Sequence, residues 1–362
     1  VLDLFKKSML HVCLAVADKE LTSLDAEEIE GKSAKALKQL LAPRLGYSRF
    51  RQRLVCEDGS ELPDDAIWTS ATGPDTLQMV FLNFVKPAEG LSEYMALVDS
   101  CRSCDAMSVE RLLRLPLDPN VRRPLHLVCG LGSLDCARLL LEAGAECDEV
   151  SDAWHDSGRS PLQAAAENGH CELVQLLADA GAAIERPTEF EGYRPVHLAA
   201  ANGYGAVVRL LIELGAHPNS WSLSYRIRPL HSAVFGNQVE VVRLLLQLGA
   251  DKDIEMEPTY GDGDGPSPLH VAAGLGKTDI IPVLLEFGDN LEKKSSVAGQ
   301  TPLHAAALNN QVTAVLHLLR AGSLVDATMV DGTTALMLAK EVGHDRIANI
   351  LQEWKAKAKA KA

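Results

Sequence analysis

The segment from Gly274 to Thr278 reads GLGKT, which has the ending of a phosphate-binding loop. Such a loop is spaced G-x-x-x-x-G-K-[ST], because its glycines let the backbone approach the phosphates, its lysine contacts the outer phosphates and its hydroxyl binds Mg²⁺. Gly276, Lys277 and Thr278 fit the last three places, but Val271 occupies the place of the first glycine. The motif is half present, and a nucleotide-binding enzyme acting through Lys277 stays as an alternative of a different functional class.

Two further segments contain the donor types of a metal site. CRSC from Cys101 to Cys104, followed by HLVC from His126 to Cys129, has roughly the spacing of a zinc ribbon. The acidic segment from Glu255 to Asp264 offers carboxylates for Ca²⁺, but it lacks the regular ligand series and the closing bidentate glutamate of a dedicated loop. Because His126 and Cys129 also belong to the repeat described next, we predict no metal and no other cofactor.

A four-residue phrase recurs seven times in the chain and gives these segments their positions. It reads RPLH at Arg123, SPLQ at Ser160, RPVH at Arg194, RPLH at Arg228, SPLH at Ser267, TPLH at Thr301 and TALM at Thr334. Successive phrases begin 37, 34, 34, 39, 34 and 33 residues apart, and each is followed by small residues, a turn residue and an apolar run such as VVRLLLQLGA from Val241. A fixed period of this length predicts a solenoid of stacked helical units.

Each part of the unit has a physical role. Proline at the first helical position lacks only an N–H that would have no partner there, so the phrase opens a helix. A left-handed turn then leads into a second helix, and its residues are Gly169, Gly203, Gly276 and Gly343, with Asn237 and Asn310 as substitutes. Gly276 therefore has a turn role, and Lys277 begins the second helix. The histidines of the phrase, on successive units, are expected to bond to the cap and the neighbouring loop.

The phrase, its period and the apolar run resemble the ankyrin repeat over roughly Gly90 to Trp354. The resemblance implies an α-solenoid of helix-turn-helix units with hairpin loops, with about seven clear repeats in an array over residues 122–354. Residues 87–121 are expected to be a linker and a degenerate capping repeat. We expect the Lys/Ala tail at 355–362 to be a solvated, frayed extension. The resemblance also implies protein binding rather than catalysis, so we predict that the chain is not an enzyme.

Residues 1–86 lack the repeat and show the pattern of a small α+β domain. Strands are predicted over Met9 to Val16, Arg51 to Cys56 and Thr76 to Val85, and a helix over Ser33 to Leu45. The order strand, strand, helix, strand, strand, with RQRLV, DGSELPDD and TLQMVFL, resembles ubiquitin-like β-grasp domains. The chain continues past this domain into the repeats, so the domain cannot be conjugated through its own terminus.

The β-grasp resemblance still allows this domain to bind another protein through the exposed face of its sheet. Val55 and Val80 match the apolar contact patch of that family. The alternative interpretation is that both are ordinary strand residues.

Composition limits the partners. The formal charge is −14, without a basic stripe, which argues against nucleic acid and favours a protein partner with a basic or apolar surface. The eight cysteines are scattered, which is typical of reduced thiols in cytoplasm or nucleus. A short apolar run after Lys7 imitates a signal peptide, but it is better explained as the first strand. Apolar stretches are too short for a membrane span. Oligomeric state stays open.

Two strips of side chains form the predicted binding surface. Aromatic residues gather in four consecutive hairpin loops, at Trp154, Phe190, Tyr193, Trp221, Tyr225 and Tyr260. Before the inter-helix turns, apolar Phe235, Leu275 and Leu308 are expected to face the concave groove. Local packing of the aromatics on their own hairpins is the alternative. We therefore predict a non-enzymatic scaffold or adaptor, and the alternative within the binding class is a ubiquitin-pathway adaptor whose β-grasp domain docks on ligase or proteasome components.

Overall fold

The computed structural model describes residues 9–14, 19–25, 29, 31–45, 48–56, 60–67, 76–81, 91–150, 158–223, 226–253, 255–256, 265–296 and 298–361. The chain divides into two compact units, Val1–Glu149 and Val150–Ala362. The first unit therefore contains the predicted small domain of residues 1–86 together with the helices that follow it. Ion pairs of Lys35 and Arg49 with Glu110 and Glu142 join these two parts.

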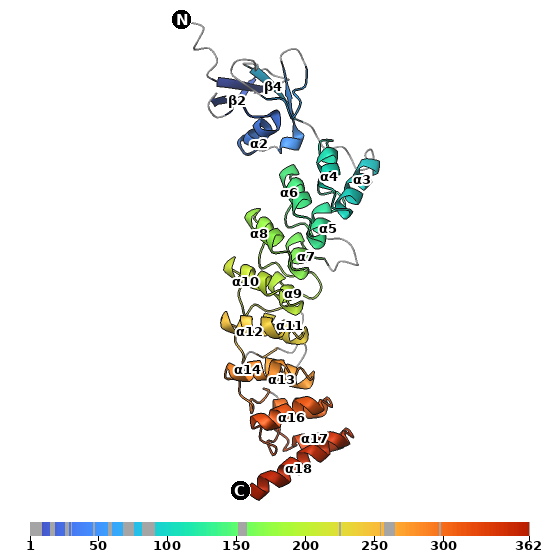
Figure 1. The fold of residues 1–362 in the computed structure, drawn as a ribbon, viewed down its shortest axis with the longest axis vertical. Coiled ribbons are helices and arrows are strands. Elements are labelled where there is room, and N and C mark those ends of the chain that lie inside the picture. The colour runs from blue at the N-terminus through green and yellow to red at the C-terminus, as the bar shows by residue number, and fades with distance from the viewer. Residues whose placement is uncertain are drawn as a thin grey trace. The chain divides into compact units, whose positions relative to one another are not determined.

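A small mixed sheet and a helix begin the first unit. The elements are β1 (Met9–Leu14), β2 (Lys19–Asp25), α2 (Ala34–Leu45), β3 (Gln52–Val55) and β4 (Thr76–Phe81). The strand order is β2-β1-β4-β3, in which β1 runs antiparallel to β2 and parallel to β4, and β3 runs antiparallel to β4. The elements follow the predicted chain order, and Figure 1 shows α2 beside the sheet.

The core of this N-terminal part lies between α2 and the sheet. Leu37 and Leu41 of α2 pack against Leu54, Leu77 and Met79 of the strands, and all five side chains are fully buried. Burying a leucine or methionine side chain stabilises a fold by about 1.5–3 kcal/mol. The alternation of buried and half-exposed residues along β3 leaves its other face outward.

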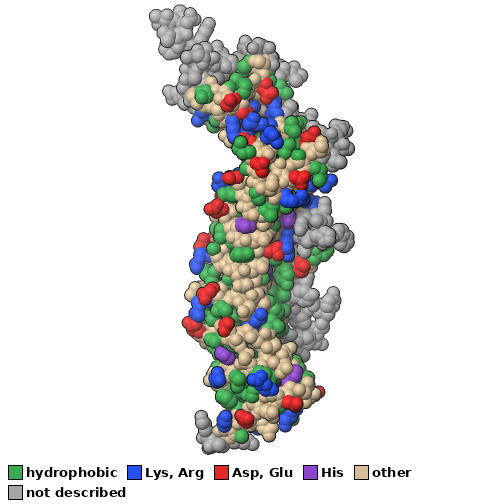
Figure 2. Space-filling view, turned by 45° about the vertical axis from the view of Figure 1, so that its right-hand side comes forward, with side chains coloured by type: hydrophobic (Ala, Val, Ile, Leu, Met, Phe, Trp, Pro, Cys, Tyr) green, Lys and Arg blue, Asp and Glu red, His purple; other side chains and the backbone are tan. Residues whose placement is uncertain are grey.

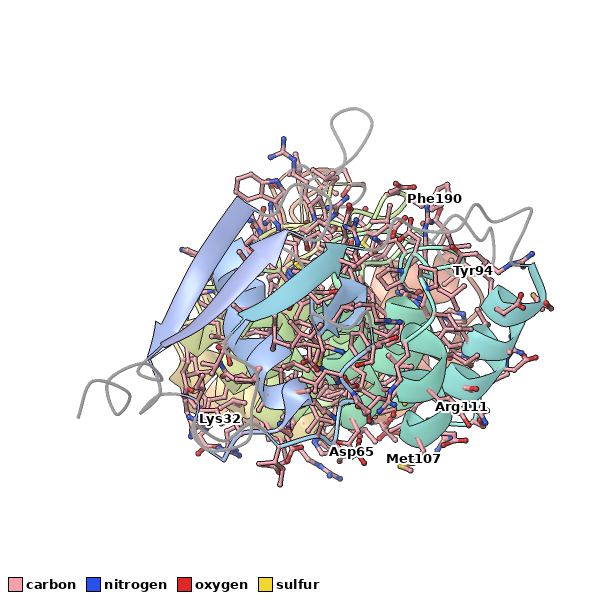
Figure 3. The ribbon with its side chains drawn as sticks, turned by 90° about the horizontal axis from the view of Figure 1, so that it is seen from above. Lys32, Asp65, Tyr94, Met107, Arg111 and Phe190 are labelled. Carbon is pink, nitrogen blue, oxygen red and sulfur yellow. The ribbon has the colours of Figure 1, made fainter. Side chains whose placement is uncertain are left out.

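Two helix pairs complete the first unit. They are α3 (Leu91–Arg102) with α4 (Ala106–Leu113), and α5 (Pro124–Leu131) with α6 (Leu134–Ala143). The pair α3–α4 comes from the segment before the first clear phrase. Tyr94 of α3 is buried and its hydroxyl accepts a hydrogen bond from the Asp118 N–H at 3.0 Å, whereas Met107 of α4 points outward (Figure 3).

Arg49 holds the sheet domain against these helix pairs. Its guanidinium is almost fully buried and forms ion pairs with Glu110 of α4, at 3.2 Å, and with Glu142 of α6. Burial alone would raise the pKa of Glu110, but the hydrogen bond from Lys35 and the charges of Lys35 and Arg49 outweigh it and hold that pKa below its usual value. A buried guanidinium with two carboxylate partners is a strong positional constraint, because removing either sign leaves the other uncompensated.

The second unit is a stack of helix pairs, each of which is a first helix followed by a second helix. The pairs are α7 (Pro161–Glu167) with α8 (Cys171–Asp179), α9 (Pro195–Ala201) with α10 (Gly205–Glu213), α11 (Pro229–Phe235) with α12 (Val239–Gln247), α13 (Pro268–Gly274) with α14 (Ile280–Glu286), α15 (Pro302–Leu308) with α16 (Val312–Ala321), and α17 (Ala335–Glu341) with α18 (Asp345–Lys361). Figure 1 shows the pairs following one another along this unit.

The turn between the two helices of a pair has the left-handed backbone predicted from the sequence. The φ angle is +81° at Gly169, +86° at Gly203, +68° at Gly276 and +76° at Gly343. Asn237 and Asn310 adopt the same conformation, at +59° and +57°. Glycine and asparagine tolerate this region better than other residues, which explains why they recur at this place.

The core of the stack comes from small residues on the first helices and leucines on the second. The alanine pairs that follow the phrase are fully buried, and they are Ala165–Ala166, Ala199–Ala200, Ala272–Ala273 and Ala306–Ala307. One leucine from each second helix is equally inaccessible, as at Leu177, Leu211, Leu245, Leu284 and Leu318. Alanine lets neighbouring helices approach closely, and leucine fills the space between layers.

The Lys/Ala tail differs from the expectation of a frayed extension. Helix α18 continues through it to Lys361, although Ala356, Lys357 and Ala358 are exposed as predicted. Lysine and alanine both have high intrinsic helix propensity, so a helix that is already nucleated by packing at Ile347 and Leu351 propagates into solvent.

Candidate functional site

Four of the five histidines of the repeated phrase bridge one repeat to the next. In these four, Nε2 lies near a backbone carbonyl of the following hairpin, at 2.9 Å for His197 and Ile227, 3.2 Å for His231 and Pro266, 2.8 Å for His270 and Gln300, and 3.2 Å for His304 and Thr333. The Nδ1 atoms of His197, His231 and His304 accept hydrogen bonds from the N–H of the cap residue. The hydrogen-bond pattern therefore assigns the proton to Nε2, and the predicted structural role is confirmed.

Burial keeps these imidazoles neutral. It is the largest cause that lowers the pKa of His197 to about 4 and that of His231 to about 3. Neighbouring Arg194 and Arg228 add to the effect, while the carbonyl partners oppose it. A second proton on either ring would sit on Nδ1, where it would point at the backbone N–H that donates a hydrogen bond to that atom. These rings are structural bridges between consecutive repeats. Because they are one repeat apart, they do not converge on a reactive centre.

The GLGKT segment has the geometry of a repeat turn. The amides that a phosphate loop would present are used internally, since the N–H of Gly276, Lys277 and Thr278 donate to carbonyls of Ala273, Ala272 and Gly276 at 3.2, 2.8 and 2.9 Å. Val271, at the place of the missing first glycine, is buried within α13. The backbone here offers a phosphate no cradle of unused amides.

In the described part of the chain, the cysteines are not arranged as ligands of a metal ion. Within this part, Cys56, Cys101, Cys104, Cys129, Cys136, Cys147 and Cys171 are free thiols, and no cluster of His, Cys, Asp or Glu is arranged to hold an ion. Burial, together with Cys136 and Cys104, raises the pKa of Cys101 to about 12, and burial raises the pKa of Cys129 as well. Residues 257–264 of the acidic segment lie outside the described residues.

An apolar groove runs along the first helices of the second unit. One pocket of about 410 Å³ is lined by Tyr193, His197, Leu198, Ala201, Ile227, Ser232, Phe235 and Met256. A second, of about 310 Å³, is lined by Phe235, Met256, Pro266, His270, Val271, Gly274, Leu275, Ser295, Gln300, Ala305 and Asn309. Phe235 and Met256 belong to both pockets. They therefore mark the boundary between two adjoining compartments of one groove.

The groove contains part of the apolar strip predicted from the sequence. Phe235 and Leu275, 41% and 46% exposed, line its pockets, and Leu308 is exposed on α15 at the next equivalent place. Residues that sequence reasoning missed complete the wall, namely Ile227, Pro266 and Gln300. The signal was available in the period, because each of them immediately precedes a cap residue, as Tyr193 does.

The histidine bridges fix this wall. The carbonyls that His197, His231 and His270 bind belong to Ile227, Pro266 and Gln300, whose side chains line the groove. The repeat phrase thus positions the groove residue of the next hairpin, which is a direct link between a folding device and a binding surface.

The loop aromatics separate into two kinds. Tyr193 is half-buried and lines the groove, with its ring 6.0 Å from that of His197. Phe190 is 61% exposed and is labelled in Figure 3, and Trp221 is 44% exposed. Trp154, Tyr225 and Tyr260 lie outside the described residues. The described aromatics therefore do not all share one surface.

In the first unit, Val55 and Val80 lie on neighbouring strands and on the same face of the sheet. Arg53 pairs with Val80 and Val55 pairs with Gln78 across the antiparallel ladder, so the two valines alternate with the core residues Leu54 and Met79. Both valines are half-exposed. The structure thus brings the two valines together on one half-exposed face of the sheet.

Charge is mixed over the visible surface. Figure 2 shows Lys and Arg side chains interspersed with Asp and Glu on the face in view. Among the described residues, none of the helices has the length and apolar composition needed to cross a membrane.

The comparison with known proteins assigns the family. A family model for ankyrin repeats, built of three copies, matches residues 97–188, 183–256, 230–329 and 269–362. The chain belongs to the ankyrin repeat family. Ankyrin repeat proteins generally mediate protein–protein interaction, and they are typically non-enzymatic scaffolds.

Individual ankyrin repeat relatives match short segments. Ankyrin repeat and SOCS box protein 11 of Homo sapiens is 38% identical over 68 residues, which are 19% of this chain and 20% of that protein. Neurogenic locus notch homolog protein 4 of Homo sapiens is 44% identical over 78 residues, 21% of this chain and 4% of that protein. Ankyrin repeat domain-containing protein 13B of Mus musculus is 46% identical over 61 residues, 17% of this chain and 9% of that protein. The chain thus spans a fifth or less of these relatives.

A solved ankyrin repeat structure extends the likeness. The crystal structure of the human ASB11 ankyrin repeat domain has a TM-score of 0.52 and 28% sequence identity, and the match covers 60% of this chain and 92% of that one. The helical stack of the ankyrin array is therefore supported by both sequence and structure.

Proposed function

We propose that this ankyrin repeat chain is a non-enzymatic scaffold or adaptor that holds a protein partner in the groove of its second unit. The observation that carries the proposal is the pair of adjoining pockets that share Phe235 and Met256. Concave, mostly apolar sites of this size suit large side chains of a partner. Exposed Phe190 and Trp221 supply further anchors, because rigid aromatic side chains give much contact area for little conformational entropy.

The hairpin walls support binding of an extended segment. Successive groove residues, at Tyr193, Ile227, Pro266 and Gln300, recur once per repeat, and histidine bridges hold the last three. A partner strand lying along them would meet one wall residue from each repeat. Preorganised walls lower the entropy that binding must otherwise overcome.

The test is capture of partners by the full chain. The parent, Phe235→Glu and the matched control Leu324→Glu, which places the same charge at another exposed apolar residue, are compared by affinity purification and mass spectrometry. Proteins captured by the parent and the control but lost in Phe235→Glu locate binding in the groove. Equal capture by all three removes the groove from the proposal. A further variant, with alanine at Trp154, Phe190, Tyr225 and Tyr260, separates loop contacts from groove contacts.

A second function is favoured by the sheet of the first unit. The order β2-β1-β4-β3, with β1 parallel to β4 and α2 packed on one face, supports assignment of residues 1–86 as a ubiquitin-like β-grasp domain. In that case Val55 and Val80 form a docking patch on the opposite face, and the chain is an adaptor of the ubiquitin pathway that brings a client to ligase or proteasome components.

Matched substitutions test the adaptor role. The full chain with serine at both Val55 and Val80 is compared with Ile67→Ser, which removes an exposed apolar side chain of the same unit that lies outside the sheet. Ligase or proteasome components that co-purify with the parent should be lost only in the double variant. If all three proteins retain them, or none does, the adaptor role is withdrawn. Free cysteines throughout the described residues favour work under reducing conditions and placement in cytoplasm or nucleus.

A further inference from the structure

Trp221 stands among three arginines on the hairpin loops of two consecutive repeats. The guanidinium carbon of Arg228 lies 5.0 Å from the centre of the indole, that of Arg226 lies 5.9 Å away and that of Arg194 lies 6.0 Å away. Trp221 and Arg226 are exposed, and Arg194 and Arg228 are half-buried. We call these four residues the arginine–tryptophan cluster. Cations at this distance are attracted by the aromatic ring, which holds the guanidiniums together despite their mutual repulsion.

Two of these arginines occupy a place that other repeats give to a better capping residue. Arg194 and Arg228 precede the helix proline, a place that Arg123 also occupies in an earlier unit and that four units give to serine or threonine, at Ser160, Ser267, Thr301 and Thr334. Serine and threonine at this place accept a hydrogen bond from the first turn, and a guanidinium has no acceptor. Helices α9 and α11, like α5 and α13, therefore begin without the side-chain cap that stabilises α7.

The third arginine occupies a place that suits glycine. Arg226 has φ of +46°, two residues before its cap. The equivalent residues of four other hairpins are Gly158, Gly192, Gly299 and Gly332, with φ between +61° and +83°, whereas Gly265 before Ser267 does not have a left-handed φ. A side chain in this region is strained, and strained residues persist mainly where function retains them. All three arginines thus depart from the locally favourable residue, in adjacent repeats, around one indole.

The charge of this cluster opposes that of the whole chain. The hairpin from Asn219 to Arg228 contains two arginines and no acidic residue, although the chain has a formal charge of −14. Nε of Arg194 forms an ion pair with a carboxylate oxygen of Glu185 at 3.0 Å. Arg228 donates a hydrogen bond to the Asn219 carbonyl at 2.8 Å. The guanidinium fork matches carboxylates in two-point hydrogen bonds, and such bonds are the strong ones at surfaces.

The cluster and the groove share the same hairpins. Tyr193, which lines the larger pocket, is adjacent to Arg194, and Ile227 of that pocket lies between Arg226 and Arg228. One short peptide can therefore reach both surfaces. We propose that the arginine–tryptophan cluster binds carboxylates of an acidic partner segment while a neighbouring large apolar side chain of that segment enters the pocket beside Phe235. This inference rests on the proposed function and adds the partner's chemistry.

Peptide selection on the full chain tests it. A phage-displayed library of random dodecapeptides is selected on the parent and, in parallel, on Arg226→Gly. Enrichment of sequences that combine aspartate or glutamate with a large apolar residue on the parent, and its loss on the variant, supports the inference. Enrichment of neutral or basic apolar peptides overturns it and leaves groove binding intact. Failure to enrich any peptide family argues against both the inference and the proposed function.

Affinity measurements on one enriched peptide complete the test. Arg226→Gly should weaken its binding by about tenfold, the equivalent of about 1.4 kcal/mol for a lost charge-assisted contact. The melting temperature should stay the same or rise, because glycine relieves the left-handed strain, so that unfolding cannot explain the loss. Arg209→Gln, at an exposed arginine of α10, should bind like the parent. Equal affinity of Arg226→Gly and the parent, or unchanged affinity when the peptide's carboxylates become amides, overturns the inference.

Discussion

The buried histidines should make the stability of the second unit depend on pH in the acidic range. Folding lowers the pKa of His197 to about 4 and that of His231 to about 3, chiefly through burial. The unfolded chain, with imidazole pKa values of about 6.5, therefore binds protons more readily than the folded chain. Their contribution is fully present above about pH 6.5 and is lost as the pH falls toward the lowered values.

The magnitude follows from the difference in proton binding. At about pH 5, each solvated imidazole of pKa about 6.5 gains about 2 kcal/mol by protonation, and the two buried rings gain almost none. Together they should destabilise the fold by about 4 kcal/mol relative to neutral pH. Asp289 acts in the opposite sense, because burial raises its pKa to about 6 and the folded chain then retains that proton. Its contribution at about pH 5 is about 1 kcal/mol.

The chain itself contains the substitution that isolates this effect. Gln163 occupies the histidine place in α7, where its side chain accepts from the Ser160 N–H and donates to the Arg186 carbonyl, both at 2.7 Å. Glutamine therefore keeps the cap bond and a bond to the next hairpin without titrating, although its partner Arg186 lies earlier in the hairpin than the place of Ile227. We expect His197→Gln combined with His231→Gln to stay within about 1 kcal/mol of the parent at neutral pH.

Urea unfolding followed by far-ultraviolet circular dichroism provides the assay. Between neutral pH and about pH 5, the double variant should lose about 4 kcal/mol less of its unfolding free energy than the parent. His317→Gln, at an exposed position on α16, should follow the parent. Equal losses for parent and double variant would refute the assignment of acid sensitivity to the histidine bridges.

Three further predictions concern the packing of the repeats, the first unit and the incomplete phosphate-loop motif. In Gly236→Ala the new Cβ would lie 1.9 Å from the Ala201 carbonyl oxygen, so we expect a loss of about 3 kcal/mol or more in thermal unfolding, and an unchanged midpoint would contradict the close approach of α9 and α11. Arg49→Met should lower the free energy of unfolding in urea by about 2–4 kcal/mol. Adding Glu110→Gln should recover part of this loss, because the second substitution removes the carboxylate that has lost its partner. Mg-ATP should leave the melting temperature of the parent and of Lys277→Ala equally unaffected, whereas a shift in the parent that Lys277→Ala abolishes would restore nucleotide binding.

The repeat positions were the most predictable part of the molecule. Left-handed backbone is accessible to few residues, so the glycines and asparagines between helices identified the turns directly. The phrase histidines were equally informative because their spacing repeats with the fold. The sheet elements also occurred in the predicted order, since apolar alternation and the helix pattern are local signals.

The hairpins were harder to predict because their side chains are oriented by contacts with the next repeat. Tyr193 faces the groove, whereas Phe190, three residues earlier, faces solvent, and composition treats the two alike. Met256 lines both pockets from a loop that has no recurring phrase. Recognising the arginine–tryptophan cluster required the φ angle of Arg226, and a single sequence does not reveal that angle. The tail was misjudged because helix propagation depends on the packed turns before it.

The histidine bridges have a consequence for how the length of the array can change. Each bridge joins a ring only to the hairpin that comes next, as His197 does with the Ile227 carbonyl. Excision of Arg228 to Pro266 would join Ile227 directly to Ser267 and would leave that bond in place. Gene duplication or loss of one whole unit therefore creates a junction already present elsewhere in the protein, while a deletion of half a unit does not. The array can lengthen or shorten by recombination in steps of one repeat, and with each step the groove gains or loses one wall residue.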